Sequence, residues 1–268
     1  MQRSLVLSDI DGTLLDDQHQ LPAAVIAAVH DYVTAGGHFC LASARPPRGM
    51  VALADQLGAN GPLVSLNGAL IVTATDAGFT PLAEQPLPVG AAQTIAACSQ
   101  TLAQPISLNL FAGLDWCAAP SAWVTQEQAI TGFAPTATDP VALLASGRPV
   151  HKVLCMGGPA AIDALAAALT AVPGLEVTLA RSKPTYLEIT HPAVSKLAAL
   201  RFLAAHDHLP MTATMAMGDG DNDIPMVAAA GVGIALANGS AGVRAAATHV
   251  VPANTAGGAA VALRTYAM

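Results

Sequence analysis

Charge is scarce in this chain of 268 residues, because Asp, Glu, Lys and Arg together make up only 11% of it. An average soluble domain has about 25%. The 11 basic residues are outnumbered by 18 acidic ones, which gives a formal net charge of −7. So few basic residues exclude the electrostatic footprint of a non-specific nucleic-acid binder, and we expect no nucleic-acid partner. The hydrophobic content of 53% excludes a disordered, charge-rich chain.

Cysteine and long hydrophobic runs are scarce as well. The four cysteines are far apart and form no CxxC pair, so we expect reduced, buried thiols rather than disulfides or a metal site. The apolar run 225–237 has 13 residues and contains two glycines, whereas a membrane-spanning helix needs about 20 apolar residues. No hydrophobic leader precedes Asp9. These features predict a soluble protein of the cytoplasm with no membrane partner.

Short apolar runs alternate with alanine-rich helical patterns, which is typical of an α/β fold. Strands are expected near the amino terminus at 4–8, 38–42 and 62–65, with a helix over 22–34. Proline and glycine cluster after residue 82, as in a linker, and a second series of strands and helices follows. A third series starts near residue 186. We therefore predict a Rossmann-like parallel-sheet core, residues 1–82 and 187–268, interrupted by an inserted domain, residues 83–186.

Two aspartates come directly after the first expected strand. In Asp9-Ile10-Asp11-Gly12-Thr13, the strand would deliver Asp9 to its carboxyl end, where parallel sheets bind ligands. Two carboxylates this close repel unless a cation or a shared proton intervenes, which suits an oxygen-liganded metal such as Mg²⁺. The pair also suits a nucleophile with an acid–base partner. An Asx-type turn is the alternative.

A second acidic segment, GDGDND at 218–223, follows the expected strand 214–217. Its three aspartates repel one another in the absence of a cation. An EF-hand loop is excluded, because Ile224 occupies the required glycine position and no bidentate glutamate follows. The alternative is helix capping, with Pro225 in the first turn, but capping needs only one such residue.

Two further motifs supply donors for a phosphate group. Lys196 follows Ser195, a suitable N-cap, so its ammonium would oppose the helix macrodipole unless it faces an anion. Ser43 and Arg45 follow the expected strand 38–42, and both side chains donate to phosphate oxygens. Taken singly, a solvated surface lysine and an ordinary loop are the alternatives. No P-loop, GxSxG or HExxH motif occurs in the chain.

The four motifs stand in a fixed order along the chain: Asp9 with Asp11, then Ser43, then Lys196, then Asp219 with Asp223. This order resembles the haloacid dehalogenase (HAD) superfamily of phosphohydrolases, and more narrowly its Cof-type, class IIB branch. The segments 66–69 and 186–189 are similar to that branch too. The resemblance implies a HAD-like α/β core with an inserted α+β cap over residues 83–186 that sets substrate specificity.

The resemblance also implies a role for each matching residue. Asp9 would be the nucleophile that forms an aspartyl-phosphate, and Asp11 would protonate the leaving alkoxide and then activate water. Mg²⁺ would be bound by Asp9, Asp219, Asp223 and, through its backbone carbonyl, Asp11. The phosphate would be held by Ser43, Ala44, Lys196 and Asn222. Ala44 replaces the glycine that is usual in the family, but alanine keeps the N–H donor.

We expect a Mg²⁺-dependent phosphatase of a small phosphorylated metabolite, with sugar phosphates as the expected class. The alternatives are a phosphomutase, which would pass the phosphate to a second hydroxyl, and a non-catalytic ligand-binding protein on the same fold. Candidate substrate contacts are Arg45, Asn67 and Gly68 in the core and Lys183 and Tyr186 near the cap-to-core return. The sequence identifies neither the sugar nor the oligomeric state, for which a homodimer is one option.

Overall fold

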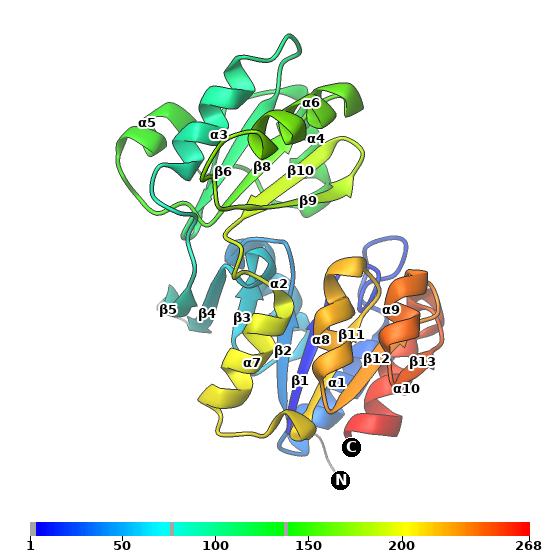
Figure 1. Cartoon of the computed structure of the whole chain (residues 1–268). Coiled ribbons are helices and arrows are strands. Elements are labelled where there is room, and N and C mark those ends of the chain that lie inside the picture. Colours follow the sequence, from blue (N-terminus) through cyan, green and yellow to red (C-terminus); the bar gives the residue numbers. More distant parts are fainter. Residues whose placement is uncertain (1–3, 76–77, 137–138) are drawn as a thin grey trace. The chain divides into compact units, whose positions relative to one another are not determined.

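A computed structural model describes residues 4–75, 78–136 and 139–268. The chain divides into two compact units, each shown in Figure 1. The first combines Met1–Leu82 with Ser195–Met268, and the second is the continuous segment Ala83–Val194. The expected mixed α/β architecture, with a largely parallel central sheet and a separate second sheet, is confirmed.

The first unit is built on an eight-stranded sheet of order β13-β12-β11-β1-β2-β3-β4-β5. Its strands are β1 (Leu5–Asp9), β2 (His38–Ala42), β3 (Leu63–Ser65), β4 (Leu70–Thr75), β5 (Gly78–Glu84), β11 (Thr214–Gly218), β12 (Val232–Leu236) and β13 (His249–Val251). The pairs from β13 to β3 are parallel, and β4 runs antiparallel to β3. All residues of β1, β11 and β12 are buried, as expected for parallel strands covered on both faces.

Two helical layers cover this sheet. One contains α1 (Ala23–Thr34), α2 (Val51–Leu57) and α10 (Gly258–Ala262); the other contains α7 (Lys196–His206), α8 (Ile224–Ala229) and α9 (Ala241–Ala246). Alanine is the strongest helix former, so these alanine-rich segments need few other signals. Side-chain caps start two of them, because Ser195 Oγ accepts from Ala198 N and Ser240 Oγ accepts from Val243 N.

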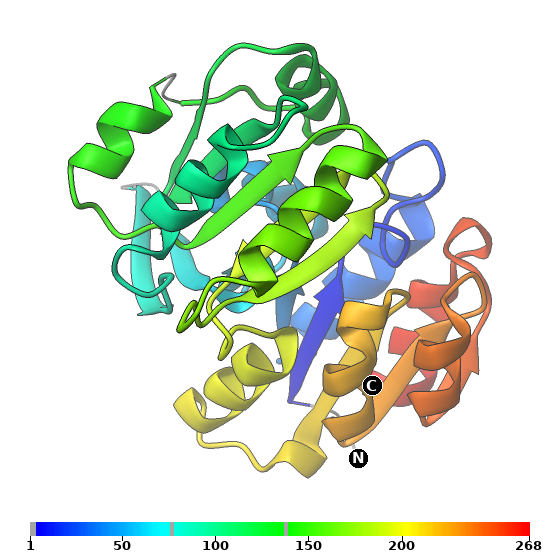
Figure 2. The ribbon, with the colours of Figure 1, turned by 45° about the horizontal axis from the view of Figure 1, so that its top comes forward.

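The second unit carries its own five-stranded antiparallel sheet of order β7-β6-β8-β10-β9. Its strands are β6 (Ser107–Ala112), β7 (Asp115–Ala118), β8 (Lys152–Met156), β9 (Thr178–Lys183) and β10 (Tyr186–Thr190), and its helices are α3 (Ala91–Gln100), α4 (Ala122–Thr131), α5 (Pro140–Ala145) and α6 (Pro159–Thr170). Figure 2 shows α3 and α6 side by side over one face of this sheet. Their apolar residues form a core with Val153, Cys155 and Leu187.

The chain returns to the first unit later than the sequence predicts. The sequence predicts that residues 187–194 belong to the core, but β10 pairs with β8 and β9, so the second unit continues to Val194. The linker expected after residue 82 begins with a strand, since β5 reaches Glu84 and includes Pro81. Proline is tolerated there because β5 is an edge strand. All four cysteines are free; Cys40, Cys117 and Cys155 are buried, and Cys98 is only partly buried.

Candidate active site

The register of the central strands brings three of the motifs to one edge of the sheet. Ser8 pairs with Met217 and Asp9 pairs with Ala42. The carboxyl end of β1 is therefore flanked by the segment that starts at Asp219 on one side and by Ser43 on the other. The chain proceeds from β1 to β2 on one side and returns through β11 on the other. This is a topological switch point, where α/β sheets bind their ligands.

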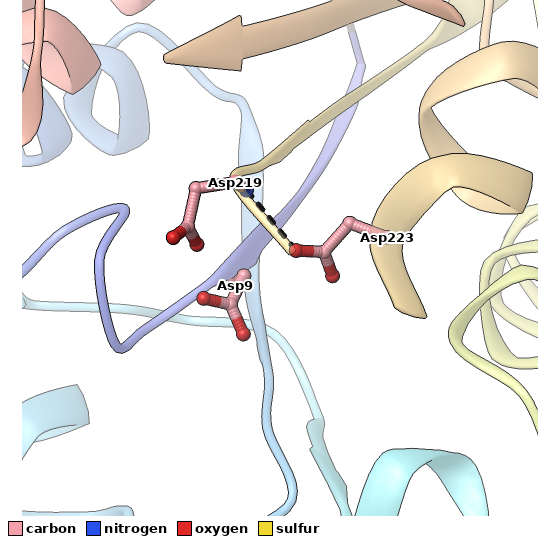
Figure 3. Close-up of side chains that lie close together, drawn as sticks. All are labelled: Asp9, Asp219 and Asp223. Atoms are coloured by element: carbon pink, nitrogen blue, oxygen red, sulfur yellow. Dashed lines mark hydrogen bonds between the residues drawn. The ribbon is translucent and has the colours of Figure 1, made fainter. Parts of the chain in front are cut away.

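Three carboxylates and one ammonium group meet at this switch point. Figure 3 shows the carboxylates of Asp9, Asp219 and Asp223 turned toward one another, with one oxygen of each within 4.8 Å of the others. Nζ of Lys196 donates to Asp9 Oδ1 at 2.5 Å and to Asp223 Oδ1 at 2.6 Å. Asp9 and Lys196 are separated by 187 positions in the sequence, so only the fold brings them together.

Backbone and hydroxyl donors hold Asp219 and Asp223 of the second acidic segment. Asp223 Oδ2 accepts from the N–H groups of Asp219, at 3.1 Å, and Gly220, at 3.0 Å. Thr13 Oγ1 donates to Asp219 Oδ1 at 3.1 Å. Gly12 has φ +81°, and a Cβ on it would lie 2.3 Å from Asp219 Oδ2. The turn after β1 therefore requires glycine at position 12 for two reasons. Only glycine readily adopts this backbone conformation, and a Cβ would occupy the space that the Asp219 side chain fills.

The electrostatics of the cluster show an excess of negative charge. Burial raises the pKa of Asp9 to about 8, with Lys196 opposing this rise and the charges of Asp223 and Asp219 adding to it. Burial and the charge of Asp223 also raise the pKa of Asp219. Burial alone would lower the pKa of Lys196, but the carboxylates of Asp9 and Asp223 raise it above its ordinary value. The cluster therefore contains three acidic side chains and one ammonium group, which bonds two of them.

This donor set fits a hard divalent cation. Carboxylate oxygens are the ligands that Mg²⁺ takes up, and a cation among them would offset the repulsion that disfavours an ionised Asp9. Within residues 4–75, 78–136 and 139–268, no other group of three or more acidic, histidine or cysteine side chains comes this close together. The side chain of Asp11 lies outside this cluster; the contribution expected from Asp11 is its backbone carbonyl, and that stays a prediction.

Asp11 is instead bound by Arg45. Arg45 Nε donates to Asp11 Oδ2 at 3.0 Å, and Nη2 donates to Oδ1 at 2.7 Å. This two-pronged pair fixes the plane of the carboxylate. His19 Nδ1 lies 3.7 Å from Asp11 Oδ1. The sequence assigned Arg45 to the substrate and gave no signal of its pairing with Asp11, because the two are 34 positions apart.

The remaining predicted core residues lie around this cluster. Ser43 is buried, and its hydroxyl accepts from the N–H of Arg45 at 3.1 Å. Ala44 follows it in the loop after β2. Asn222 is exposed, and its amide donates to Asn67 Oδ1 at 3.4 Å. Gly68 packs against the backbone at Ser195, the residue before Lys196.

The two predicted cap contacts belong to the second unit and lie next to each other. Nζ of Lys183 lies 4.4 Å from the centroid of the Tyr186 ring, a cation–π distance. The Tyr186 hydroxyl donates to Glu127 Oε2 at 2.7 Å. Sequence reasoning missed Glu127, because a glutamate on an amphipathic helix carries no signal of its partner.

Two polar residues near the cluster have no role predicted from the sequence. Thr13 lies within the first motif, two residues after Asp11, and this position is the one feature of the sequence that indicates a place near the site. Asn238 Nδ2 donates to the carbonyl of Gly12 at 2.8 Å, and its Oδ1 accepts from Asn254 N at 3.0 Å. Asn238 thus connects the turn after β1 with the C-terminal part of the chain.

In the part of the chain that the structure describes, no helix combines the length and apolarity needed to cross a bilayer.

Comparison with known proteins agrees with this geometry. A protein of Haemophilus influenzae named "Putative phosphatase" is 28% identical over 206 residues, which cover 76% of this chain and 75% of that protein. A haloacid dehalogenase-like hydrolase from Bacteroides thetaiotaomicron is 25% identical, with a TM-score of 0.87, over 97% of this chain and 98% of the other. A HAD subclass IIB sugar phosphatase shares the fold at 19% identity, with a TM-score of 0.83 over 98% of each chain.

The family assignment rests on most of the chain. The family model described as haloacid dehalogenase-like hydrolase matches residues 6–263, a range that includes Asp9, Lys196 and Asp219 with Asp223. The sheet order, the inserted second unit and the acidic cluster at the switch point agree with this match. The chain therefore belongs to the haloacid dehalogenase-like hydrolase family.

Proposed function

We propose that this protein is a Mg²⁺-dependent phosphatase of small phosphorylated metabolites, with sugar monophosphates as the substrate class. One observation carries the proposal: the buried Asp9 carboxylate lies at the end of β1, bonded to Lys196 and close to Asp219 and Asp223. The phosphatase names of its relatives support the reaction type. The fold shared with a subclass IIB sugar phosphatase supports the substrate class.

The metal would be held by the carboxylates of Asp9, Asp219 and Asp223. Bound there, Mg²⁺ would neutralise charge on the phosphoryl oxygens, which is most of what phosphoryl transfer asks of an enzyme. Lys196 would keep the Asp9 carboxylate oriented through its bond to Oδ1. Ser43, the N–H of Ala44, Lys196 and Asn222 would bind phosphate oxygens.

Two displacements complete the proposed reaction. An Asp9 carboxylate oxygen attacks phosphorus, the bond from phosphorus to the substrate oxygen breaks, and Asp11 gives its proton to the leaving alkoxide. Asp11 then takes a proton from water, whose oxygen attacks phosphorus and releases phosphate and free Asp9. In this structure both oxygens of Asp11 accept from Arg45. Each carboxylate oxygen has two lone pairs, so Asp11 keeps acceptor sites for the proton beside these bonds.

The second unit would contact the part of the substrate beyond the phosphate. Lys183 and Tyr186 are our candidates there, since an ammonium and an aromatic ring suit a polar sugar with apolar faces. The expected cytoplasmic location and the homodimer stay predictions.

The proposal is tested by phosphate release from a panel of sugar monophosphates in the presence of Mg²⁺. The wild-type protein is expected to hydrolyse members of the panel, and Asp9→Asn is expected to lose at least about a thousandfold in kcat, because the nucleophile is gone. Asp31→Asn, on the exposed side of α1, is the matched control and should keep full activity. Undiminished hydrolysis by Asp9→Asn would exclude the mechanism.

A further inference from the structure

The turn between β3 and β4, Leu66–Gly68, has an unusual backbone conformation. Leu66 has φ +52°, Asn67 has φ +60° and Gly68 has φ +102°. Left-handed conformations are disfavoured for residues with a Cβ, above all for bulky ones such as leucine. Among the described residues, four non-glycine positions have positive φ, and two of them are adjacent here. Leu66 is fully buried, so the surrounding structure imposes this conformation.

The two left-handed residues give their N–H groups to the loop after β2. Leu66 N donates to the carbonyl of Arg45 at 3.0 Å, and Asn67 N donates to the carbonyl of Ser43 at 2.8 Å. These are the residues on either side of Ala44, so both ends of this segment are tied to one turn. Ser43 N in turn donates to the carbonyl of Val64 in β3, at 2.9 Å.

The segment held in this way carries the guanidinium that fixes Asp11. The bonds from Arg45 Nε and Nη2 to the Asp11 carboxylate are 3.0 and 2.7 Å long. A fork of this kind is sensitive to the position of its backbone, because both bonds must align at once. A shift at the carbonyl of Arg45 would therefore move Asp11.

The third residue of the turn contacts the start of α7. A Cβ on Gly68 would lie 2.8 Å from the carbonyl oxygen of Ser195 and 3.4 Å from the Cβ of Ala199. Ser195 caps α7 and directly precedes Lys196, whose Nζ bonds Asp9. The backbone that places Lys196 is therefore packed directly on Gly68.

We infer that the turn Leu66–Gly68 is a positioning element of the active site, which aligns Asp11 through residues 43–45 and Lys196 through the start of α7. Strained backbone persists at functional sites where the surrounding structure enforces it. Here the N–H groups of the two strained residues, Leu66 and Asn67, are the ones that bond residues 43–45. The inference rests on the proposed function, because that function gives Asp11 and Lys196 their tasks. The three residues act through others and need not touch the substrate.

Gly68→Ala tests the contact with α7, and Gly36→Ala is its matched control. Gly36 has φ +91° in the same unit, but nothing lies within 4 Å of where its Cβ would be. Both variants meet the backbone penalty, and only Gly68→Ala pushes on Ser195. We expect kcat/KM to fall about 10- to 100-fold in Gly68→Ala relative to Gly36→Ala, since small misplacements of catalytic groups have effects of this size. Equal values in the two variants would overturn the inference.

Asn67 tests the bond to Ser43 through the backbone. Valine strongly disfavours positive φ, whereas glycine accepts it. Asn67→Gly is therefore expected to have a kcat at least about tenfold higher than Asn67→Val, although both lack the amide that meets Asn222. His208→Val is the control, because His208 has φ +55° beyond the far end of α7. Equal activity of the glycine and valine variants would contradict a backbone role.

A readout besides turnover separates positioning from mere loss of stability. Orthophosphate binding is measured by calorimetry in the presence of Mg²⁺, at a temperature well below the melting temperature of each variant. The affinity for orthophosphate should weaken in Gly68→Ala and stay unchanged in Gly36→Ala. Asp9→Asn is assayed in parallel. If it remains active, the proposed function fails; if it is inactive while the turn variants match their controls, the positioning inference alone fails. Unchanged phosphate affinity in Gly68→Ala would count against the contact with α7 whatever the turnover.

Discussion

At the scale of single residues, Asp219 has a charge that its surroundings disfavour and that the proposed metal site requires. Its carboxylate is half-buried beside Asp223, and burial together with that neighbouring charge raises its pKa. Thr13 Oγ1 offers it one hydrogen bond. A group whose folded pKa is raised costs stability whenever it is ionised. Function and stability therefore make opposite demands at this position, as they often do in active sites.

We predict that Asp219→Asn stabilises the metal-free protein. Removing one charge from the cluster should raise the melting temperature by about 2–4 °C, the shift that about 1 kcal/mol produces in a chain of this size. Mg²⁺ should then raise the melting temperature of the wild type and have little effect on the variant, because a ligand is lost. Thermal unfolding with chelator and with Mg²⁺ measures both effects. A lower melting temperature for the variant in chelator would contradict this account.

At the scale of helices and strands, the sequence predicts well the elements that lead to the site. β2 has the expected bounds, β11 ends one residue later than expected, and β1 begins and ends one residue later than expected. Continuous apolar runs that end in Asp or Ser mark the carboxyl ends of buried strands. The positions of Asp9, Ser43 and Asp219 at one sheet edge follow from that pattern alone.

Pairing between distant segments could not be predicted in the same way. Tyr186-Leu-Glu-Ile-Thr alternates as any half-buried strand does, and nothing in it says whether its neighbour will be β8 or a core strand. The Arg45–Asp11 pair and the left-handed Leu66 are likewise consequences of tertiary structure. The helices α2 and α5 were not predicted, because at seven and six residues they offer too short a periodic pattern.

One buried histidine of the second unit, His151, should make the stability of that unit depend on pH. His151, next to the start of β8, is buried; its Nδ1 accepts from Gly113 N at 3.1 Å and its Nε2 meets Glu84 at 3.1 Å. Burial lowers its pKa, and the bond to Glu84 opposes this only in part. The unfolded chain therefore takes up the proton first as the pH falls.

We predict that the urea midpoint of the second unit is highest above about pH 6.5, the ordinary pKa of histidine, and declines as the pH falls from there through the lower folded pKa. His151→Gln should flatten this decline, whereas His30→Gln, an exposed position in α1, should keep it. The measurement is urea unfolding at a series of pH values between 5 and 8. A wild-type slope in His151→Gln would show that other groups cause the decline.

At the scale of the whole molecule, both tryptophans report on one unit. Trp116 and Trp123 lie in the second unit, where the Trp116 indole is buried, stacks on Phe111 with ring centroids 6.0 Å apart, and donates to Asn109 Oδ1 at 3.0 Å. The acidic cluster lies in the first unit. Tryptophan emission and metal binding therefore probe different halves of the chain.

This division predicts that Mg²⁺ stabilises the two units unequally. Since a ligand stabilises only the structure that binds it, Mg²⁺ should raise the urea midpoint of the first unit, followed by hydrogen exchange of the β1 amides, and leave that of tryptophan emission unchanged. Asp219→Asn serves as the control in which neither midpoint moves. Equal shifts of both midpoints would mean that the units unfold as one cooperative body.

The central place of β1 also affects how the protein is made. β1 leaves the ribosome about 200 residues before its neighbour β11, which begins at Thr214. At about 5–20 residues per second, one edge of the nascent β1 waits on the order of ten seconds or more for its partner. The continuous segment Ala83–Val194 is fully synthesised during that interval. We therefore expect translation to yield a folded insertion first and to assemble Asp9 with its acidic neighbours last.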